Sequence, residues 1–281
     1  MCYYNYVRVY AATMWWTGNA VSVFGLKITI METYFNIRYE LDKARALQAI
    51  DDHVRQCVPG YVCVADGVIV NIVNSNDSYR KVVDGAMFSI CDSSYVPLYL
   101  RWIYGRRYEQ YCGSQIFMDI IRSRKYRMFF MGTSQNILDG LKANLARENP
   151  DVVKMTFYEL PFCTVDEFDY PAIAKMVETD KADIVWVALG APKQEIFMNR
   201  LLPYLKRGVM IAVGAAFKFY SGVNVSRAPQ WMVRHHLEFV HRIISEPRKQ
   251  LKRCAGIITT LPKLLAGEWS RKQKRVKNSM I

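Results

Sequence analysis

Short apolar segments alternate with amphipathic ones along most of this chain, from about residue 23 onward. The apolar segments are rich in β-branched residues and end at turn residues, which is typical of buried strands. The segments between them repeat their apolar positions every three or four residues, as surface helices do. This alternation predicts an α/β fold with a mostly parallel sheet covered by helices on both faces. The predicted strands are Gly25–Ile30, Tyr61–Ala65, Ala86–Cys91, Arg127–Met131, Val152–Tyr158, Asp183–Leu189 and Val209–Val213, and the predicted helices include Leu41–Cys57, Gly113–Arg122, Asn136–Arg147, 167–178 and 192–205.

Polar or glycine residues follow several of the predicted strands. Asp92, Gly132-Thr133, Gly190 and Gly214 each stand where a strand ends. In parallel α/β sheets, ligands bind beyond the carboxyl ends of the strands. Because these ends meet at one edge of the sheet, the sequence predicts a ligand site there.

The segment 188–195 predicts a strand that runs directly into a helix. Gly190 allows a sharp turn and a close approach to a ligand, and Pro192 suits the first helical position. Free backbone N–H groups at that helix start, with Lys193 beside them, suit an anionic group such as a diphosphate. The alternative is an ordinary strand–helix turn in which Pro192 and Glu195 only start the helix.

Asp92 is a candidate general base, because a carboxylate at this edge of the sheet can reach a bound hydroxyl. The alternative is a helix cap for the segment that starts near Tyr95. The chain contains no GxSxG, HExxH, Walker A, GxGxxG or Asp-x-Asp motif, so a divalent metal is not indicated.

Positive charge is concentrated at the C-terminal end of the chain. From residue 227 onward there are 13 Lys and Arg against three Glu, a net +10 of the total +13. We expect an N-terminal extension (1–22), a core (23–224), a basic amphipathic helical appendage (225–269) and a basic disordered tail (270–281), with a kink or a restart of the helix at Pro262. The apolar stripe of the appendage comprises Leu251, Cys254, Ile258, Leu261 and Leu265.

This stripe has two compatible interpretations, either contact with an anionic membrane surface or packing against the α/β core. Nucleic-acid binding is disfavoured, because the tail lacks interleaved aromatic residues. The seven cysteines show no CxxC spacing, which indicates reduced thiols in a cytoplasmic compartment. No apolar run has membrane-spanning length, and no signal peptide is indicated.

Several motifs together resemble one enzyme family, the WecG/TagA/CpsF glycosyltransferases (family 26), over about Val23 to Arg253. The motifs are Gly190-Ala-Pro-Lys-Gln-Glu195, Val213-Gly-Ala-Ala-Phe217, Gly222, Arg227-Ala-Pro-x-Trp231, Leu237-Glu238, Arg242 and Glu246-Pro-Arg248.

The resemblance implies a Rossmann-like core with a C-terminal helical membrane-binding appendage. It also implies an inverting, metal-independent transfer of an N-acetylmannosamine-type or other hexose from a UDP-sugar to a polyprenyl-diphosphate-linked sugar. Such enzymes need no cofactor and serve cell-surface polysaccharide synthesis, peripherally at the cytoplasmic face of the bacterial inner membrane. A homo-oligomer is compatible with the resemblance.

The family's catalytic Asp falls on Asp92, and Asp66 is a second carboxylate candidate. Appendage arginines (Arg227, Arg234, Arg242, Arg248) are implied as partners of the diphosphate. The expected substrate-binding residues are Gly132, Thr133, Gly190, Pro192, Lys193, Gln194, Glu195, Gly214, Phe217, Arg227, Trp231, Glu238, Arg242 and Arg248.

Three positions depart from the family pattern. Val64-Ala65-Asp66 replaces a Thr-x-Asn, Lys218 replaces an acid, and Gln115 stands where Asp is common. These departures affect the identity of donor and acceptor. The competing hypotheses are a different Rossmann-type enzyme, such as a nicotinamide oxidoreductase, and a non-catalytic, membrane-docked nucleotide-binding scaffold.

Overall fold

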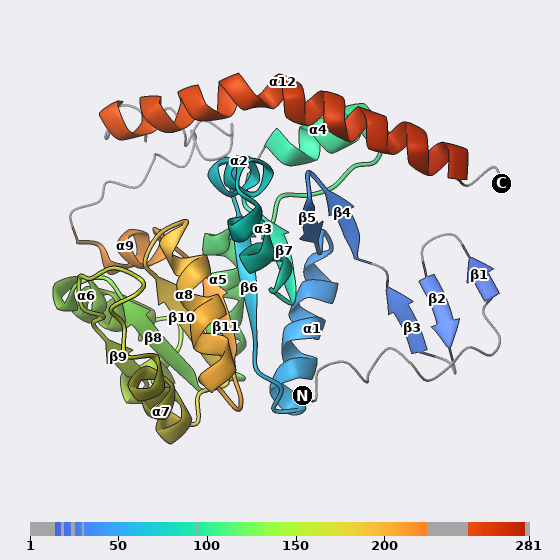
Figure 1. Cartoon of the computed structure of the whole chain (residues 1–281). Helices are drawn as coiled ribbons and strands as arrows, with labels where there is room; N and C mark the ends of the chain where they lie inside the picture. Colours follow the sequence, from blue (N-terminus) through green and yellow to red (C-terminus); the bar gives the residue numbers. More distant parts are fainter. Residues whose placement is uncertain are drawn as a thin grey trace. The chain divides into compact units, whose positions relative to one another are not determined.

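Eight strands form the central sheet of the computed structural model (Figure 1). The structure describes residues 31–93, 95–223 and the helix 247–278, with side chains in that helix at 255–275 and 277, and three strands among the first 30 residues. The neighbouring strands from β5 to β9 in this sheet are paired in parallel, as expected. The strand order is β4 (Glu32–Tyr34), β5 (Ile37–Tyr39), β7 (Phe88–Cys91), β6 (Gly60–Ala65), β11 (Val209–Ala212), β10 (Ile184–Ala188), β8 (Met128–Gly132) and β9 (Thr156–Tyr158).

Helices cover both faces of this sheet, which confirms the predicted fold class. On one face α9 (Ala216–Ser221) packs against α5 (Gly113–Ser123) and α6 (Gln135–Leu145), and α1 (Lys43–Arg55) is joined to α5 by an ion pair. On the other face α8 (Lys193–Leu201) packs against α3 (Asp77–Asp84) and α7 (Tyr170–Asp180), and α2 (Gly67–Ser75) packs against α3.

The central strands are buried along their whole length, because helices cover both of their sides. Phe117 of α5 fills one layer of the core. Its ring centre lies 4.8 Å from that of Trp186 and 5.8 Å from that of Phe217. The apolar runs of the sequence therefore form the core that their composition predicts.

The first strand prediction was wrong in its placement. Residues 26–29 do form a strand, β3 (Leu26–Thr29), but it pairs antiparallel with β2 (Ala20–Val23) in a separate sheet with β1 (Trp15–Thr17). Only two residues separate β2 from β3, too few for the crossover that a parallel pair needs. These strands belong to a compact unit of residues 1–32, distinct from residues 33–281.

The segment predicted as a strand from Val152 to Tyr158 is only partly one. Residues 150–154 form a 3₁₀ turn, which Asn149 starts by accepting a hydrogen bond from the Asp151 N–H, and β9 follows as a short strand. Pro150 at the start of this turn favours the helical conformation there.

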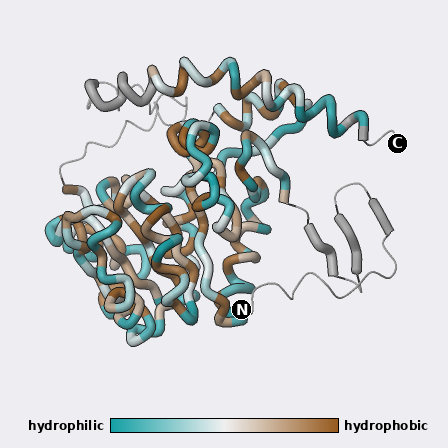
Figure 2. Tube along the Cα trace, viewed as in Figure 1, coloured by the Kyte–Doolittle hydropathy of each residue, from teal (hydrophilic) through white to brown (hydrophobic). Residues whose placement is uncertain are grey.

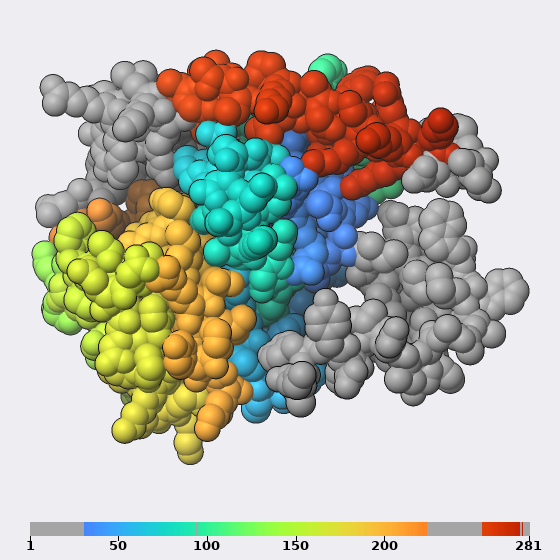
Figure 3. Space-filling view, viewed as in Figure 1, coloured from blue at the N-terminus to red at the C-terminus, as the bar shows by residue number. Residues whose placement is uncertain are grey.

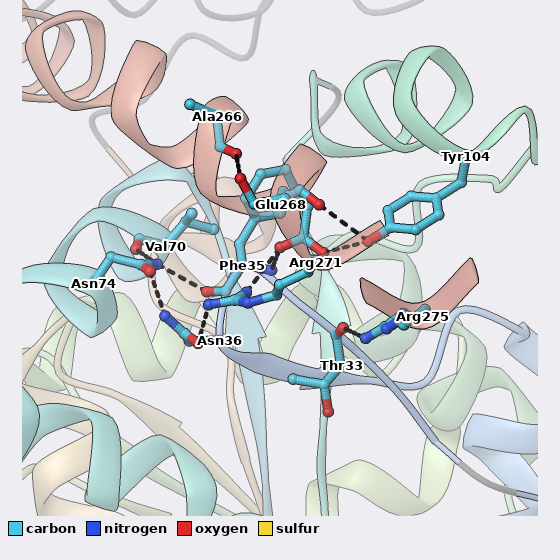
Figure 4. Close-up of polar contacts among 11 residues, drawn as sticks. Thr33, Phe35, Asn36, Val70, Asn74, Tyr104, Ala266, Glu268, Arg271 and Arg275 are labelled. Carbon is cyan, nitrogen blue, oxygen red and sulfur yellow. Dashed lines mark hydrogen bonds and ion pairs between the residues drawn. The ribbon is translucent and has the colours of Figure 1, made fainter. Parts of the chain in front are cut away.

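The C-terminal helix α12 (Pro247–Asn278) corrects two expectations. It does not restart at Pro262, and it remains helical across most of the tail expected to be disordered from residue 270. Tertiary contacts hold this part of the helix (Figure 4). The Arg275 guanidinium donates to the Thr33 carbonyl oxygen at 2.6 Å, and the Arg271 guanidinium donates to the Asn36 side-chain oxygen.

This helix lies across α2 and beside α4 (Tyr95–Tyr104), as Figure 3 shows for α2. An added Cβ at Gly67 would lie 3.0 Å from Ile257 Cδ1, so glycine permits this close contact. Leu264 and Leu265 pack against the main core. Of the apolar stripe, Leu265 therefore packs against the core, whereas Ile258 is 67% exposed. No described helix has both the length and the apolar content that crossing a bilayer requires.

Candidate active site

Five adjacent strands bring the predicted strand-end residues to one edge of the sheet. In the order β7, β6, β11, β10, β8, their carboxyl ends lead to Asp92, Asp66, Gly214, Gly190 and Thr133. From β8 the chain continues outward to β9, whereas from β10 it continues in the opposite direction to β11. Parallel α/β sheets commonly bind ligands at such a reversal, which makes the loops at Gly132-Thr133 and Gly190 the candidate ligand site.

Asp92 is held at the start of α5. Its Oδ1 accepts a hydrogen bond from the Gly113 N–H at 2.8 Å, and its own N–H donates to the Ala65 carbonyl oxygen. Ser93 Oγ accepts from the Tyr95 N–H at 3.3 Å. The half-buried Asp92 carboxylate thus sits where the dipole of α5 favours a negative charge.

Asp66 instead caps a helix. Its Oδ1 accepts hydrogen bonds from the N–H groups of Val68 (2.9 Å) and Ile69 (3.0 Å), the first turn of α2. Two backbone donors engage the same carboxylate oxygen, which is the usual role of Asp at this position. This structural role explains why a carboxylate stands in the Val64-Ala65-Asp66 segment.

Replacing Asp66 with Ala is expected to lower the free energy of unfolding by about 1 kcal/mol, because the first turn of α2 loses its cap. Asp66→Asn should stay near the wild type, since the amide oxygen can accept the same bonds. Urea unfolding of both variants measures the difference. Equal stability of Asp66→Ala and wild type would show that the cap contributes nothing.

Two glycines at the strand ends have different roles: Gly132 is needed for close backbone packing, and Gly190 leaves open space. Gly132 has φ +106°, and a Cβ there would lie 2.7 Å from the Ala188 carbonyl oxygen. Gly190 has φ +77°, and nothing lies within 4 Å of its added Cβ. Thr133 also has a positive φ, of 60°. The backbone at Gly190 is therefore open to the approach of a ligand.

Gln194 and Glu195 hold the loop before α8 in place through a chain of hydrogen bonds. Gln194 Oε1 accepts from the Gly190 N–H at 3.1 Å, and its Nε2 donates to Glu195 Oε1 at 2.9 Å. Tyr79 of α3 donates from its hydroxyl to Glu195 Oε2 at 3.1 Å. Burial raises the pKa of the Glu195 carboxyl to about 7, although both of these hydrogen bonds act in the opposite direction. Burial and the neighbouring Glu195 raise the pKa of Tyr79 well above its usual range, so this phenol remains a donor.

The raised pKa of Glu195 predicts a loss of stability between about pH 4.5 and pH 7. In that interval the folded state holds a proton that the unfolded state has released, so the free energy of unfolding falls as the pH rises. At about 1.4 kcal/mol per pKa unit the fall approaches ~3 kcal/mol. Glu195→Gln removes this titration. Urea unfolding across this range should show the variant and the wild type diverging with pH, and parallel curves would contradict the assignment.

Other predicted site residues lie elsewhere or outside the described residues. The Lys193 ammonium donates to the Cys163 carbonyl oxygen and lies 5.1 Å from the centre of the Phe168 ring. Phe217 is fully buried in the core. Pro192 is the N-cap of α8 rather than its first residue, and its peptide bond to Ala191 is cis.

The remaining predicted site residues lie outside the described part of the chain. They are Arg227, Trp231, Arg234, Glu238 and Arg242, together with the side chain of Arg248 in the first turn of α12.

Two contributors to this edge were not identified from the sequence. Gly113 places its N–H on Asp92, and an added Cβ there would lie 3.1 Å from Val64 Cγ1. Tyr79 supports Glu195 from a different helix. The Gly113-Ser114 pair at the start of α5 is the only feature of the sequence that could have indicated the role of Gly113. Gln115, noted as a departure, accepts from the Cys112 N–H at 3.1 Å and so caps this helix.

A surface cavity of about 490 Å³ runs along α5 from Ser114 and Gln115 and is also lined by α6 and Tyr220. None of the predicted site residues lines it, and an Arg122–Glu148 ion pair occupies part of its wall. Within the described residues no three His, Cys, Asp or Glu side chains form a metal-ligand group.

Known proteins resemble this chain over most of its length. Residues 32–275 match the family described as "Glycosyl transferase WecG/TagA/CpsF family". A protein of Bacillus subtilis strain 168 is 27% identical over 198 residues, 66% of this chain and 75% of that protein. A protein of Bacillus spizizenii strain W23 is 27% identical over 177 residues, 62% of this chain and 66% of that protein. Both are named N-acetylglucosaminyldiphosphoundecaprenol N-acetyl-beta-D-mannosaminyltransferase.

The family match covers the sheet, the carboxyl edge with Asp92 and most of α12, and it confirms the resemblance read from the motifs. This chain belongs to the WecG/TagA/CpsF glycosyl transferase family and is a glycosyltransferase.

Proposed function

We propose that this protein transfers a sugar, such as N-acetylmannosamine, from a UDP-sugar to N-acetylglucosamine on a polyprenyl diphosphate. The observation that carries the proposal is that Asp92, held by the Gly113 N–H, and the glycine-containing loops lie at the same edge of the sheet. The names of the two Bacillus relatives describe a transfer of this kind. The product would be an early unit of a cell-surface polysaccharide.

The donor is proposed to bind at the loops that follow β8 and β10. Gly132, Thr133 and Gly190 have positive φ there and can bring backbone close to a uridine or ribose. At the start of α8 the Gln194 N–H already donates to the Gly190 carbonyl oxygen at 3.0 Å, so the contribution proposed for this helix is the positive end of its dipole rather than a set of free N–H groups. Lys193 would leave the Cys163 carbonyl oxygen to contact it. Guanidinium groups of Arg227, Arg242 and Arg248 are the proposed further partners, which would make a divalent metal unnecessary.

Asp92 is the proposed general base. The acceptor hydroxyl attacks the anomeric carbon from the face opposite the UDP, so the configuration at that carbon inverts. Asp92 takes the hydroxyl proton as the new C–O bond forms, and UDP departs with the electron pair of the bond that breaks. The Gly113 N–H holds one oxygen of the carboxylate in position for this step.

The acceptor carries a lipid, and we propose that α12 holds the enzyme at the cytoplasmic face of the bacterial membrane. Residues 247–278 contain ten Lys and Arg and one acidic residue, Glu268, which is buried. The C-terminal part of the helix is predominantly hydrophilic (Figure 2). Each exposed cation near an anionic bilayer contributes about 1 kcal/mol.

Ligand-dependent melting tests the nucleotide part of the proposal. UDP at saturating concentration should raise the melting temperature, because it binds only the folded state, and NAD should not. The shift should persist in EDTA if no divalent metal takes part. A shift with NAD alone would favour the oxidoreductase hypothesis. A UDP shift without any sugar transfer would favour the non-catalytic scaffold.

A further inference from the structure

Helix α4 exposes large apolar side chains on one face. Tyr95, Leu98 and Trp102 are 43%, 56% and 65% exposed. They stand at i, i+3 and i+7, so they share one side of the helix. The opposite side of α4 is already buried in the core through Val96, Pro97, Leu100 and Ile103. The exposed side is thus a surface in its own right.

The surface continues onto α12. The ring centre of Trp269, 40% exposed, lies 5.5 Å from that of Trp102. Ile258, 67% exposed, precedes Trp269 by eleven residues, or three helical turns, and so lies on the same side of α12. We name Tyr95, Leu98, Trp102 and Trp269 the aromatic ridge. Soluble surfaces seldom gather large apolar residues in this way without a binding function.

Cations border the aromatic ridge. The Lys272 ammonium lies 5.2 Å from the Trp269 ring centre, and Arg101 is exposed on α4 itself. Helix α4 contains no acidic residue. The single one in α12, Glu268, is buried and paired with Arg271. The two helices therefore present apolar and cationic groups together, with no exposed carboxylate of their own.

We propose that the aromatic ridge inserts into the interfacial region of an anionic lipid bilayer. Trp and Tyr rings favour the boundary between headgroups and acyl chains, Leu98 can enter the apolar side, and the bordering cations can meet lipid phosphates. A second copy of this chain fits less well, because it would bring like charges together. Membrane binding then depends on apolar contacts of α4 as well as on the charge of α12.

This inference rests in part on the proposed function, since it also explains how the enzyme meets its acceptor. Helix α4 starts three residues after Asp92. A bilayer that holds α4 therefore holds the proposed general base near the headgroups, where the diphosphate of a lipid-linked acceptor lies.

Vesicle sedimentation tests the surface without using activity. The full chain is mixed with phosphatidylcholine vesicles containing phosphatidylglycerol, as wild type and as the triple variant Tyr95→Ser/Leu98→Ser/Trp102→Ser. The triple variant should partition at least ~10-fold less, because insertion of apolar area is lost. Tyr204→Ser is the matched control, since this tyrosine is 50% exposed but follows α8 at the other edge of the sheet. The single variant Leu98→Gln serves if the triple variant unfolds.

Two further measurements separate the alternatives. Brominated lipids should quench Trp fluorescence in the wild type and clearly less in Trp102→Phe. At high salt the wild type should still bind better than the triple variant, because an apolar contribution is not screened. Unchanged partitioning of both α4 variants would overturn the proposal, and so would conversion of a dimer to a monomer by the triple substitution with vesicle binding intact.

Activity assays keep this inference distinct from the proposed function. With a short-chain acceptor dissolved in water, the triple variant should match the wild type, whereas with an acceptor embedded in vesicles it should be at least ~10-fold slower. Equal loss on both acceptors would overturn the membrane role of the ridge. Failure of the wild type on both acceptors would refute the proposed reaction but would leave the vesicle-binding result standing.

Discussion

Replacing Asp92 with Asn is expected to lower kcat for sugar transfer by ~10²–10⁴-fold. Asn retains an oxygen that can accept the Gly113 N–H, so the start of α5 should keep its geometry. It cannot take a proton from the acceptor hydroxyl, and the chemical step slows accordingly. The measurement is single-turnover transfer to a lipid-linked acceptor, with the KM of each substrate determined in parallel. A role in chemistry predicts a change in kcat with little change in KM.

Asp66→Asn is the matched control for that experiment. It removes a carboxylate from the neighbouring strand end while keeping an oxygen for the cap of α2. Its kcat should stay within a few-fold of the wild-type value, whereas the loss of a general base should lower kcat by ~10²-fold or more. A large loss in Asp66→Asn with full activity in Asp92→Asn would move the general base to Asp66.

Replacing Glu268 with Ala is expected to destabilise the contact between α12 and the sheet by about 2–4 kcal/mol. The buried carboxylate accepts from the Phe35 N–H (2.7 Å) and the Tyr104 hydroxyl (2.7 Å) and pairs with Arg271 (2.8 Å), as Figure 4 shows. Removal leaves these donors without their acceptor. The value stays below that of a fully buried pair because the Arg271 side chain is 34% exposed.

The loss of stability in Glu268→Ala should affect α12 and its contacts first and leave the central sheet folded. Hydrogen exchange should accelerate along α12 and in the turn at Phe35 and Asn36, whereas the strands β6 and β10 keep their protection. Glu268→Gln retains one acceptor oxygen and should show a smaller change. Ser270→Ala, two residues along the same helix and exposed, is the neutral control. Unchanged exchange in Glu268→Ala would show that this carboxylate does not hold the helix.

The central α/β core could be predicted because its strands are buried on both faces and its helices are amphipathic. Both patterns are local and survive without knowledge of the partner segments. The N-terminal strands could not be assigned correctly, because whether β3 joins the large sheet or a hairpin depends on which strands pair. The helical state of residues 270–278 depends on Glu268, Arg271 and Arg275 meeting the turn between β4 and β5. Nothing in the composition of the tail reveals those contacts.

The site was predicted in part for the same reason. The strand ends that hold Asp92, Gly132 and Gly190 follow from the βα alternation. The family motif drew attention to Gln194 and Glu195, but their partner Tyr79 comes from a helix more than 100 residues away in sequence. The exposure of Trp102 could not be predicted either, because all residues of α4 except Arg101 are apolar or aromatic, and only packing decides which of them remain exposed.

Transfer of radiolabelled sugar tests the central claim most directly. The wild-type chain is incubated in liposomes with a panel of UDP-sugars and a polyprenyl-diphosphate-linked N-acetylglucosamine, with EDTA present. A single β-linked disaccharide lipid from one donor, absent with Asp92→Asn, is the result we predict. No product from any UDP-sugar, with no binding of UDP, would contradict the proposed reaction at this sheet edge.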